Sequence, residues 1–325
     1  MRTVSYDQFG EPADVLRTLE VEAPSPAPGE VLLRMALSPI HHHDLWTIRG
    51  SYGVRPELPS GAGSEAVAVV EALGEGVEGV AIGDRVAASA VTGAWSELFT
   101  APAASLIPLP EQLPDEAAAQ LVAMPFSAVS LLEHLGLQRG EVLVQNAATG
   151  AVGRLVAQFA TARGIRVISL VRRSSGIEEL AAQGIGDVVA TDQEDWQEQA
   201  RALIGGARVP AGLDSVGGEA AGQVLSLLED GGRLVVFGAM GASTMALPSG
   251  PIIFRDLHVE GFWGARVSQE MPPEVRRRLI GEILSGLLSG EVTLPVAGTF
   301  GLDEVADAVA ATLTDGRVGK VLLRP

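Results

Sequence analysis

The feature that most constrains this chain is a regular alternation of short apolar runs and helix-like segments, which begins near Glu141. Apolar strands that alternate with helices are typical of a parallel sheet covered by helices on both faces. We therefore expect a doubly wound α/β unit in this part of the chain. The predicted strands are 142–145, 167–171, 187–190, 212–216 and 233–237, and the predicted helices are 151–163, 177–182, 196–204 and 219–228.

A glycine-rich turn separates the first of these strands from the helix that follows. It matches the dinucleotide-binding fingerprint Gly-x-Gly-x-x-Gly, with Ala148 in place of the first glycine. In such a turn Gly150 lets the backbone approach a pyrophosphate, and Gly153 lets the helix pack closely on the strand. The alternative is a tight turn that binds nothing. The pattern favours a Rossmann domain whose predicted phosphate contacts are Thr149, Gly150, Ala151, Val152 and Gly153.

The end of the second predicted strand indicates which dinucleotide binds. Sites for NAD usually carry an acidic residue there, which binds the ribose hydroxyls. This chain instead has Arg172, Arg173 and Ser174. Guanidinium and hydroxyl groups bind a 2′-phosphate, whereas a carboxylate repels it. We therefore predict NADPH as the cofactor, with two solvated surface arginines as the alternative.

The remaining residues predict a second, β-rich unit. Residues 1–115 read as strands broken by proline and glycine turns, and a long alanine-rich helix is predicted from Asp115 to about Leu135. The segments 300–313 and 320–324 fit a return of the chain to this first unit. The predicted domains are 1–118 (β-rich), 119–265 (dinucleotide-binding) and 266–325 (the return).

Composition narrows the classes of function. The chain has 325 residues and a formal net charge of −17, so its surface repels nucleic-acid backbones and anionic membranes. It has no cysteine and a single lysine, Lys320. No apolar stretch is long enough to cross a membrane, and the first residues do not resemble a signal peptide. We expect a cytoplasmic protein that binds neither nucleic acid nor membrane.

The motifs taken together resemble the medium-chain dehydrogenase/reductase superfamily. The resemblance rests on residues 28–31 (Pro-Gly-Glu-Val), residues 83–86 (Gly-Asp-Arg-Val) and the nucleotide turn. It implies that the β-rich unit is a GroES-like catalytic domain. In zinc alcohol dehydrogenases of this superfamily, Cys-x-x-Asp and Gly-His-Glu segments supply metal ligands. The corresponding stretches here are 41–44 (His-His-His-Asp) and 63–65 (Gly-Ser-Glu), and residues 122–125 offer no third donor. Catalytic zinc needs three protein ligands, so we predict no metal.

The three consecutive histidines, His41, His42 and His43, are candidate metal ligands by residue type. In an extended strand His42 would point away from His41 and His43, so a metal ion would need Asp44 or Glu65 as a further ligand. We expect instead a surface or cleft-lining loop, and metal binding is the alternative.

Within the zinc-less branch, the chain resembles the mitochondrial-type 2-enoyl thioester reductases. Residues 50–59, 92–95, 237–240 and 254–263 carry this resemblance. It implies that Tyr52 is the catalytic tyrosine and that Lys320 contacts the cofactor. It also implies cofactor contacts at Phe237, Gly238, Met240, Phe262 and Trp263, and a substrate pocket that includes Trp95 and Met124. Met124 replaces an asparagine of the family motif. For Trp95, Phe262 and Trp263, an ordinary place in the core is the alternative.

Three functions remain open. The leading hypothesis is a zinc-independent NADPH oxidoreductase that reduces a C=C bond conjugated to a carbonyl, in a 2-enoyl thioester or an enone. The first alternative is an NADPH:quinone oxidoreductase, because the same scaffold also resembles that group. The second is a catalytically silent NADPH-binding sensor. The superfamily resemblance further suggests a homodimer joined through sheet edges in the nucleotide domain.

Overall fold

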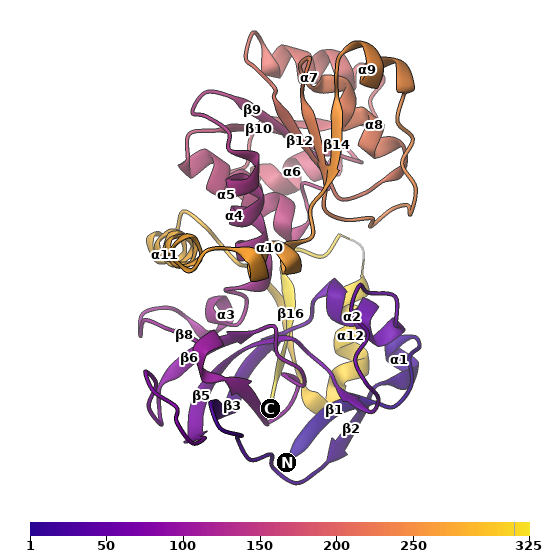
Figure 1. Ribbon diagram of the computed structural model, residues 1–325. Coiled ribbons are helices and arrows are strands. Elements are labelled where there is room, and N and C mark those ends of the chain that lie inside the picture. Colours follow the sequence, from indigo (N-terminus) through magenta and orange to yellow (C-terminus); the bar gives the residue numbers. More distant parts are fainter. Residues whose placement is uncertain (315) are drawn as a thin grey trace. The chain divides into compact units, whose positions relative to one another are not determined.

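The computed structural model describes residues 1–314 and 316–325, and the chain divides into two compact units (Figure 1). Unit 1 comprises Met1–Ala123 and Thr293–Pro325, and unit 2 comprises Met124–Val292. Among the described residues, no helix is both long enough and apolar enough to cross a bilayer.

Unit 2 contains the parallel sheet that the alternating pattern predicts. Its six strands lie in the order β11-β10-β9-β12-β13-β14, and every neighbouring pair is parallel. The strands are β9 (Val142–Gln145), β10 (Arg166–Val171), β11 (Val188–Ala190), β12 (Ala211–Asp214), β13 (Arg233–Val236) and β14 (His258–Gly261). The helices are α4 (Ala123–Leu135), α5 (Ala151–Ala162), α6 (Ser175–Ala181), α7 (Trp196–Ile204), α8 (Gly218–Leu227), α9 (Ser249–Phe254), α10 (Gly264–Glu270) and α11 (Pro273–Ser289).

Helices cover both faces of this sheet. Val142 and Val144 of β9 belong to one buried cluster with residues of α7 and α8. Gln145 has the opposite parity along the strand, and its side-chain amide donates to the carbonyl of Gly153 in α5, at 2.8 Å. Because successive side chains of a strand point to opposite faces, α5 lies on the face away from α7 and α8. The prediction of a doubly wound sheet is confirmed.

Helix α11 belongs to unit 2, whereas the sequence pattern placed residues 266–325 with the first domain. Contacts with α5 and α4 explain the difference. Arg163 at the end of α5 forms two hydrogen bonds of 2.8 Å with Glu282, and Arg278 donates to Glu133 of α4 at 2.6 Å. The return to unit 1 therefore begins only at Thr293.

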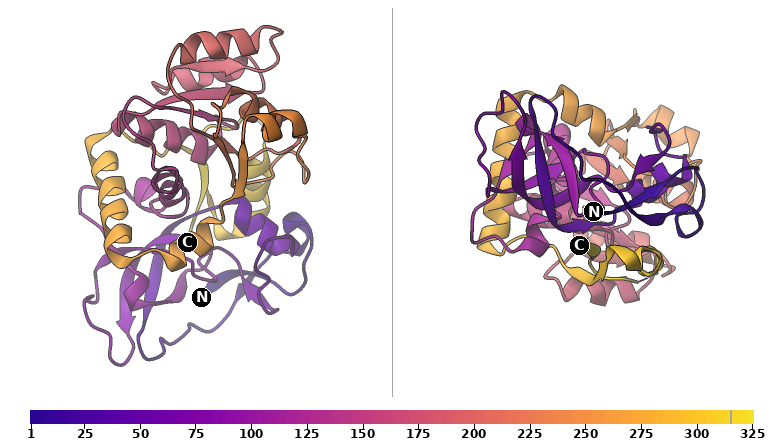
Figure 2. Two further views of the ribbon diagram at one scale, coloured as in Figure 1. Left: turned by 45° about the horizontal axis from the view of Figure 1, so that its top comes forward. Right: turned by 90° about the horizontal axis from the view of Figure 1, so that it is seen from below.

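Unit 1 is built mainly from antiparallel strands. The large sheet has the order β15-β16-β3-β5-β6-β8, with β7 paired to β3, and a small sheet has the order β2-β1-β4. The right-hand view of Figure 2 looks onto the strands of this unit. The strands are β1 (Arg2–Tyr6), β2 (Arg17–Glu20), β3 (Glu30–Pro39), β4 (Ser60–Gly61), β5 (Glu65–Leu73), β6 (Arg85–Ser89), β7 (Leu98–Pro102), β8 (Ile107–Pro108), β15 (Val296–Gly301) and β16 (Lys320–Arg324). The helices are α1 (Pro12–Val15), α2 (His42–Arg49), η1 (Ala103–Ser105), α3 (Asp115–Ala118), η2 (Leu302–Glu304) and α12 (Val305–Leu313).

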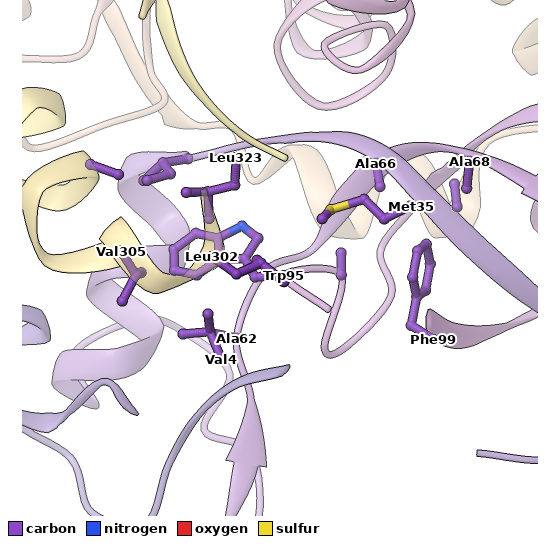
Figure 3. Packing of buried hydrophobic residues seen from close by; sticks show 14 of the residues in the cluster. Val4, Met35, Ala62, Ala66, Ala68, Trp95, Phe99, Leu302, Val305 and Leu323 are labelled. Carbon is purple, nitrogen blue, oxygen red and sulfur yellow. The ribbon is translucent and has the colours of Figure 1, made fainter. Parts of the chain in front are cut away.

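The core of unit 1 surrounds Trp95. Its indole is fully buried, and Figure 3 shows it beside Val4, Ala62 and Leu302. The indole N–H donates to the carbonyl of Pro39 at 3.3 Å. Gly63 has a φ of +88°, and a Cβ there would lie 2.2 Å from the Trp95 ring, so only glycine fits beneath it.

The long helix predicted from Asp115 to Leu135 is broken in two. Helix α3 ends at Ala118 and α4 begins at Ala123. The amide groups of Val122 and Ala123 instead donate to the carboxylate of Glu65, at 2.6 and 3.1 Å. The alanine-rich sequence favours a continuous helix, but these tertiary hydrogen bonds satisfy the amides outside it.

Candidate active site

The glycine turn lies where the strand order of the unit 2 sheet reverses. From β9 the chain first builds outward through β10 and β11, and then returns to place β12 on the other side of β9. In open α/β sheets, ligands bind beyond the carboxyl ends of the strands at this kind of reversal. The turn at residues 146–150 follows the carboxyl end of β9 directly. Topology thus supports a ligand site at the predicted fingerprint.

The third glycine of the fingerprint is required by close backbone packing. A Cβ at Gly153 would lie 2.7 Å from the carbonyl oxygen of Ala147 and 2.9 Å from the Cα of Ala148. Ala147 itself has a φ of +48°, a left-handed conformation that is uncommon for alanine. The start of α5 therefore contacts the turn backbone directly, as the fingerprint predicts for this position.

Replacing Gly153 with Ala should lower the unfolding free energy by about 2 kcal/mol, because the new methyl group meets backbone that cannot move aside. Urea denaturation measures the change. The matched control is Gly281→Ala in α11, where a Cβ meets nothing within 4 Å. That variant should gain about 0.5–1 kcal/mol from the helix propensity of alanine. Equal stability of the two variants would contradict the close packing at Gly153.

Buried polar residues hold the neighbouring loops of this site. The side-chain amide of Asn146 donates to Asp214 at 2.5 Å, and its oxygen accepts the amide of Ser215 at 3.0 Å. Asp214 is fully buried and also accepts the amides of Val216 and Gly217. The sequence reasoning missed Asn146 and Asp214. The sequence does contain a signal for both residues. Asn146 is a polar residue directly after the apolar strand β9, and Asp214 is a polar residue at the end of the apolar strand β12.

The loop after β13 packs against this same region. A Cβ at Gly238 would lie 3.0 Å from the Cβ of Ser215, and the amide of Met240 donates to the Ser215 carbonyl at 2.9 Å. Met240 is half exposed and Phe237 is partly buried. The structure thus brings this predicted loop to the carboxyl end of β12. Its contact with a cofactor stays a prediction.

The predicted 2′-phosphate residues directly follow β10. Arg172, Arg173 and Ser174 are all exposed. Within residues 1–314 and 316–325, neither arginine forms an ion pair, so both guanidinium groups are available to an anion. Ser174 differs, because its hydroxyl and its amide donate to Asp192 at 3.0 and 3.2 Å.

The other residues assigned to unit 2 by resemblance differ in exposure. Phe262 is buried, and its ring packs edge-on against His134 at a centroid distance of 5.4 Å. Trp263 is about half exposed, and Met124 near the start of α4 is partly buried. Phe262 therefore packs in the interior of unit 2, whereas Trp263 and Met124 are accessible, and the ligand contacts assigned to all three residues stay predictions.

In unit 1, a buried carboxylate organises the histidine segment. We define the Glu65 cluster as His41, Glu65, Val122 and Ala123. Glu65 begins β5 and is fully buried. One carboxylate oxygen accepts the amides of Val122 and Ala123, and the other lies 2.7 Å from His41 Nε2. The signal in the sequence was a glutamate at the start of an apolar run, which is rarely buried unless it is paired.

Burial changes the pKa values within this cluster. It raises the pKa of Glu65 to about 7, although the two backbone amides act in the opposite direction. It also lowers the pKa of His41 well below its usual value, with smaller contributions from Lys320 and His43. The pKa of His42 falls to about 4, again mainly through burial. His41 is therefore neutral at neutral pH.

The three histidines do not form the surface or cleft-lining loop expected from sequence. His41 precedes α2 and is fully buried, while His42 and His43 begin the helix and are partly buried. Asp44 causes the turn into the helix, because its carboxylate accepts the amide of His41 at 2.9 Å. The rings of His41 and His43 stack at a centroid distance of 4.8 Å.

A hydrogen-bonded chain leads from Asp44 to His43, whose ring adjoins the predicted catalytic tyrosine. The hydroxyl of Ser64 donates to Asp44 at 2.5 Å, so its oxygen accepts the Nε2–H of His43 at 2.9 Å. The ring of His43 lies 5.9 Å from that of Tyr52, which is partly buried. The structure thus brings Tyr52 and His43 together. The role of Tyr52 stays a prediction.

Two other residues predicted from the resemblance lie in the interior of unit 1. Trp95 is fully buried in the core of unit 1, in agreement with the alternative given above. A side chain with no exposed surface does not fit the wall of a substrate pocket. Lys320 is 5% exposed, and its ammonium lies 3.5 Å from the carbonyl of Ile40. Its contact with a cofactor stays a prediction.

The donor set does not fit a catalytic metal. Among the described residues, no group of three or more His, Cys, Asp or Glu side chains is arranged to hold an ion. His41 Nε2 is engaged by Glu65, and serine occupies position 64, where the resemblance to the zinc alcohol dehydrogenases implies a histidine. We therefore assign no step to a metal.

Comparison with known proteins identifies the family. Residues 27–111 match the alcohol dehydrogenase GroES-like domain, and residues 151–280 match the zinc-binding dehydrogenase domain. The mitochondrial enoyl-[acyl-carrier-protein] reductase of Homo sapiens is 30% identical over 319 residues, which cover 96% of this chain and 86% of the relative. The chain belongs to the medium-chain dehydrogenase/reductase superfamily.

Further members of the superfamily agree with the fold. The Arabidopsis thaliana enzyme of the same name is 33% identical over 269 residues, which cover 81% of this chain and 72% of the relative. The quinone oxidoreductase of Escherichia coli, solved in complex with NADPH, superposes with a TM-score of 0.89 at 26% identity. That match covers 100% of both chains. The GroES-like and Rossmann domains predicted from sequence are thus confirmed, and the protein is an oxidoreductase of this superfamily.

Proposed function

We propose that this protein is an NADPH-dependent oxidoreductase that reduces a C=C bond conjugated to a carbonyl, with 2-enoyl thioesters as the first candidates. The observation that carries the proposal is the pair of exposed, unpaired guanidinium groups of Arg172 and Arg173, in the unit whose glycine turn follows β9 at the strand reversal. The named enoyl reductase relatives support the substrate class, and the E. coli structure with NADPH supports the cofactor.

The nucleotide site supplies binding and orientation. The amides at the start of α5 would bind the pyrophosphate, and Gly150 would allow its close approach. Arg172 and Arg173 would bind the 2′-phosphate through charge-assisted hydrogen bonds. When bound, NADPH supplies a hydride to the β-carbon of the substrate.

The residues of unit 1 would handle the proton. Hydride addition builds negative charge on the carbonyl oxygen, which must be stabilised or neutralised. We assign proton donation at the α-carbon to the hydroxyl of Tyr52. The chain of Asp44, Ser64 and His43 orients the imidazole that adjoins this tyrosine.

A panel of electron acceptors tests the proposal. NADPH oxidation is followed with crotonyl-CoA, a 2-alkenal and a naphthoquinone, and we expect turnover with crotonyl-CoA. Turnover with the quinone alone would favour the second candidate, which the E. coli quinone oxidoreductase structure supports. Tight NADPH binding without oxidation by any acceptor would favour the silent sensor and contradict the proposal.

Removing the phosphate contacts should reduce NADPH binding selectively. We expect Arg172→Ala with Arg173→Ala to weaken the NADPH Kd by about 10- to 100-fold, because charge-assisted hydrogen bonds to the 2′-phosphate are lost. NADH has no 2′-phosphate, so its Kd should stay within about twofold. Fluorescence titration measures both constants. Arg201→Ala, an exposed arginine of α7, is the control for charge alone. An unchanged NADPH/NADH ratio in the double variant would refute the assignment.

We also propose a homodimer joined along β14, as the superfamily resemblance suggests. β14 is the edge strand of the unit 2 sheet, and its Val259 is exposed. An edge strand carries backbone groups that can pair with a second chain. Sedimentation analysis tests the dimer, and Val259→Pro should dissociate it.

The cytoplasmic location stays a prediction, since several relatives are named mitochondrial.

A further inference from the structure

Asp192 lies against the residues proposed to bind the cofactor 2′-phosphate. One of its carboxylate oxygens accepts the hydroxyl of Ser174 at 3.0 Å, and the other accepts the amide of Ser174 at 3.2 Å. The side-chain amide of Gln193 donates to the same hydroxyl oxygen at 3.2 Å. The amide and hydroxyl hydrogens of Ser174 therefore both point to a carboxylate.

This arrangement opposes the binding of a phosphate at Ser174. A dianionic phosphate accepts hydrogen bonds and donates none, so it has to compete with Asp192 for the two Ser174 donors. It also meets a carboxylate charge within hydrogen-bond distance of those donors. A ribose 2′-hydroxyl has the opposite property, because it can donate a hydrogen bond to a carboxylate oxygen.

Ser174 therefore adjoins charges of opposite sign, because Arg173 directly precedes it in the sequence and the carboxylate of Asp192 accepts its hydrogen bonds. Arg172 and Arg173 favour the phosphorylated cofactor, and Asp192 disfavours it. Specificity is a difference between two affinities, and a repulsive group changes it as effectively as an attractive one. Asp192 is itself exposed, so its substitution should leave the core of unit 2 intact.

We propose that Asp192 is a specificity-determining residue that limits the preference for NADPH over NADH. It does so by holding the Ser174 donors and repelling the 2′-phosphate. The inference rests on the proposed function, because it requires a dinucleotide at the unit 2 site.

The test is titration of the whole protein with NADPH and with NADH. In Asp192→Asn, the NADPH Kd should tighten by about five- to tenfold, and the NADH Kd should stay the same or weaken by about twofold. The side-chain oxygen of asparagine can still accept one of the two Ser174 hydrogen bonds, while the charge is lost. The matched control is Glu194→Gln. Glu194 lies two residues after Asp192, and its exposed side chain does not contact Ser174, so this variant removes the same charge without changing the Ser174 hydrogen bonds.

The outcomes separate the two proposals. If the unaltered protein binds neither dinucleotide, the proposed function and this inference both fail. If both dinucleotides bind and Asp192→Asn leaves the ratio of the two Kd values unchanged, only the inference fails. An equal change of the ratio in Glu194→Gln would also overturn it, because the effect would then come from net charge. The inference is supported if the NADH Kd divided by the NADPH Kd rises in Asp192→Asn and does not rise in Glu194→Gln.

Discussion

Tyr52→Phe should lower kcat for an enoyl thioester by about 100- to 1,000-fold, because a positioned proton donor contributes in that range. The Kd for NADPH should stay within about twofold, since the tyrosine is assigned to the substrate and not to the cofactor phosphates. Steady-state kinetics with crotonyl-CoA and a separate NADPH titration provide the two measurements. Unchanged turnover would remove Tyr52 from the mechanism.

The chain offers a matched control for this variant. Tyr6 is the only other tyrosine, and it is buried in the core of unit 1. Burial raises the pKa of its hydroxyl, which also interacts with Ser60. Tyr6→Phe removes the same atom, so it should cost about 1 kcal/mol of stability and leave kcat unaltered. A similar loss of kcat in both variants would indicate a structural effect.

Glu65→Ala should lower the unfolding free energy by about 3–5 kcal/mol, because it leaves buried partners without an acceptor. The amides of Val122 and Ala123 and the ring of His41 all lose their hydrogen bond to this carboxylate. Urea denaturation measures the change. Glu71→Ala on the same strand is the control, because Glu71 pairs with Arg34 at the surface and should cost less than about 1 kcal/mol.

Glu65→Gln separates the charge of this group from its hydrogen bonds. Folding raises the pKa of Glu65 from 4.5 to about 7, so between these values stability from this group is lost as the pH rises. Folding lowers the pKa of His41 below 6.5, so stability from that group is lost as the pH falls below 6.5. The two effects oppose each other between pH 4.5 and 6.5. Glutamine removes the contribution of Glu65, so between pH 6.5 and 4.5 the variant should lose about 1 kcal/mol of unfolding free energy per pH unit relative to the unaltered protein. Parallel pH profiles would contradict the buried pair.

Much of unit 2 could be predicted from sequence because its determinants are local. The runs at β9, β10 and β12 are apolar on both faces, and the helices between them have clear periodicity. Gly153 was assigned to close helix packing, and the structure confirms that contact. Each of these signals lies within a few residues of the feature that it predicts.

Other features depend on residues far apart in sequence. The break between α3 and α4 requires Glu65, which lies 57 and 58 positions away from the amides that it accepts. The burial of His41 depends on the same carboxylate. The sequence pattern places α11 with the first domain, because its contacts with Arg163 and Glu133 in unit 2 follow from no local pattern. Likewise, nothing near Ser174 in sequence indicates that Asp192 contacts it.

The division of the chain into two units also bears on the order in which they can form during synthesis. Unit 2 is one continuous stretch that carries all six strands of its sheet, so it can be completed once Val292 has been made. Unit 1 needs β16, whose Leu322 pairs with Pro39 of β3 from the other end of the chain. Contacts between such distant residues form slowly. Until β16 has been made, the core around Trp95 lacks Val321 and Leu323, so the other strands of unit 1 expose apolar surface that favours aggregation.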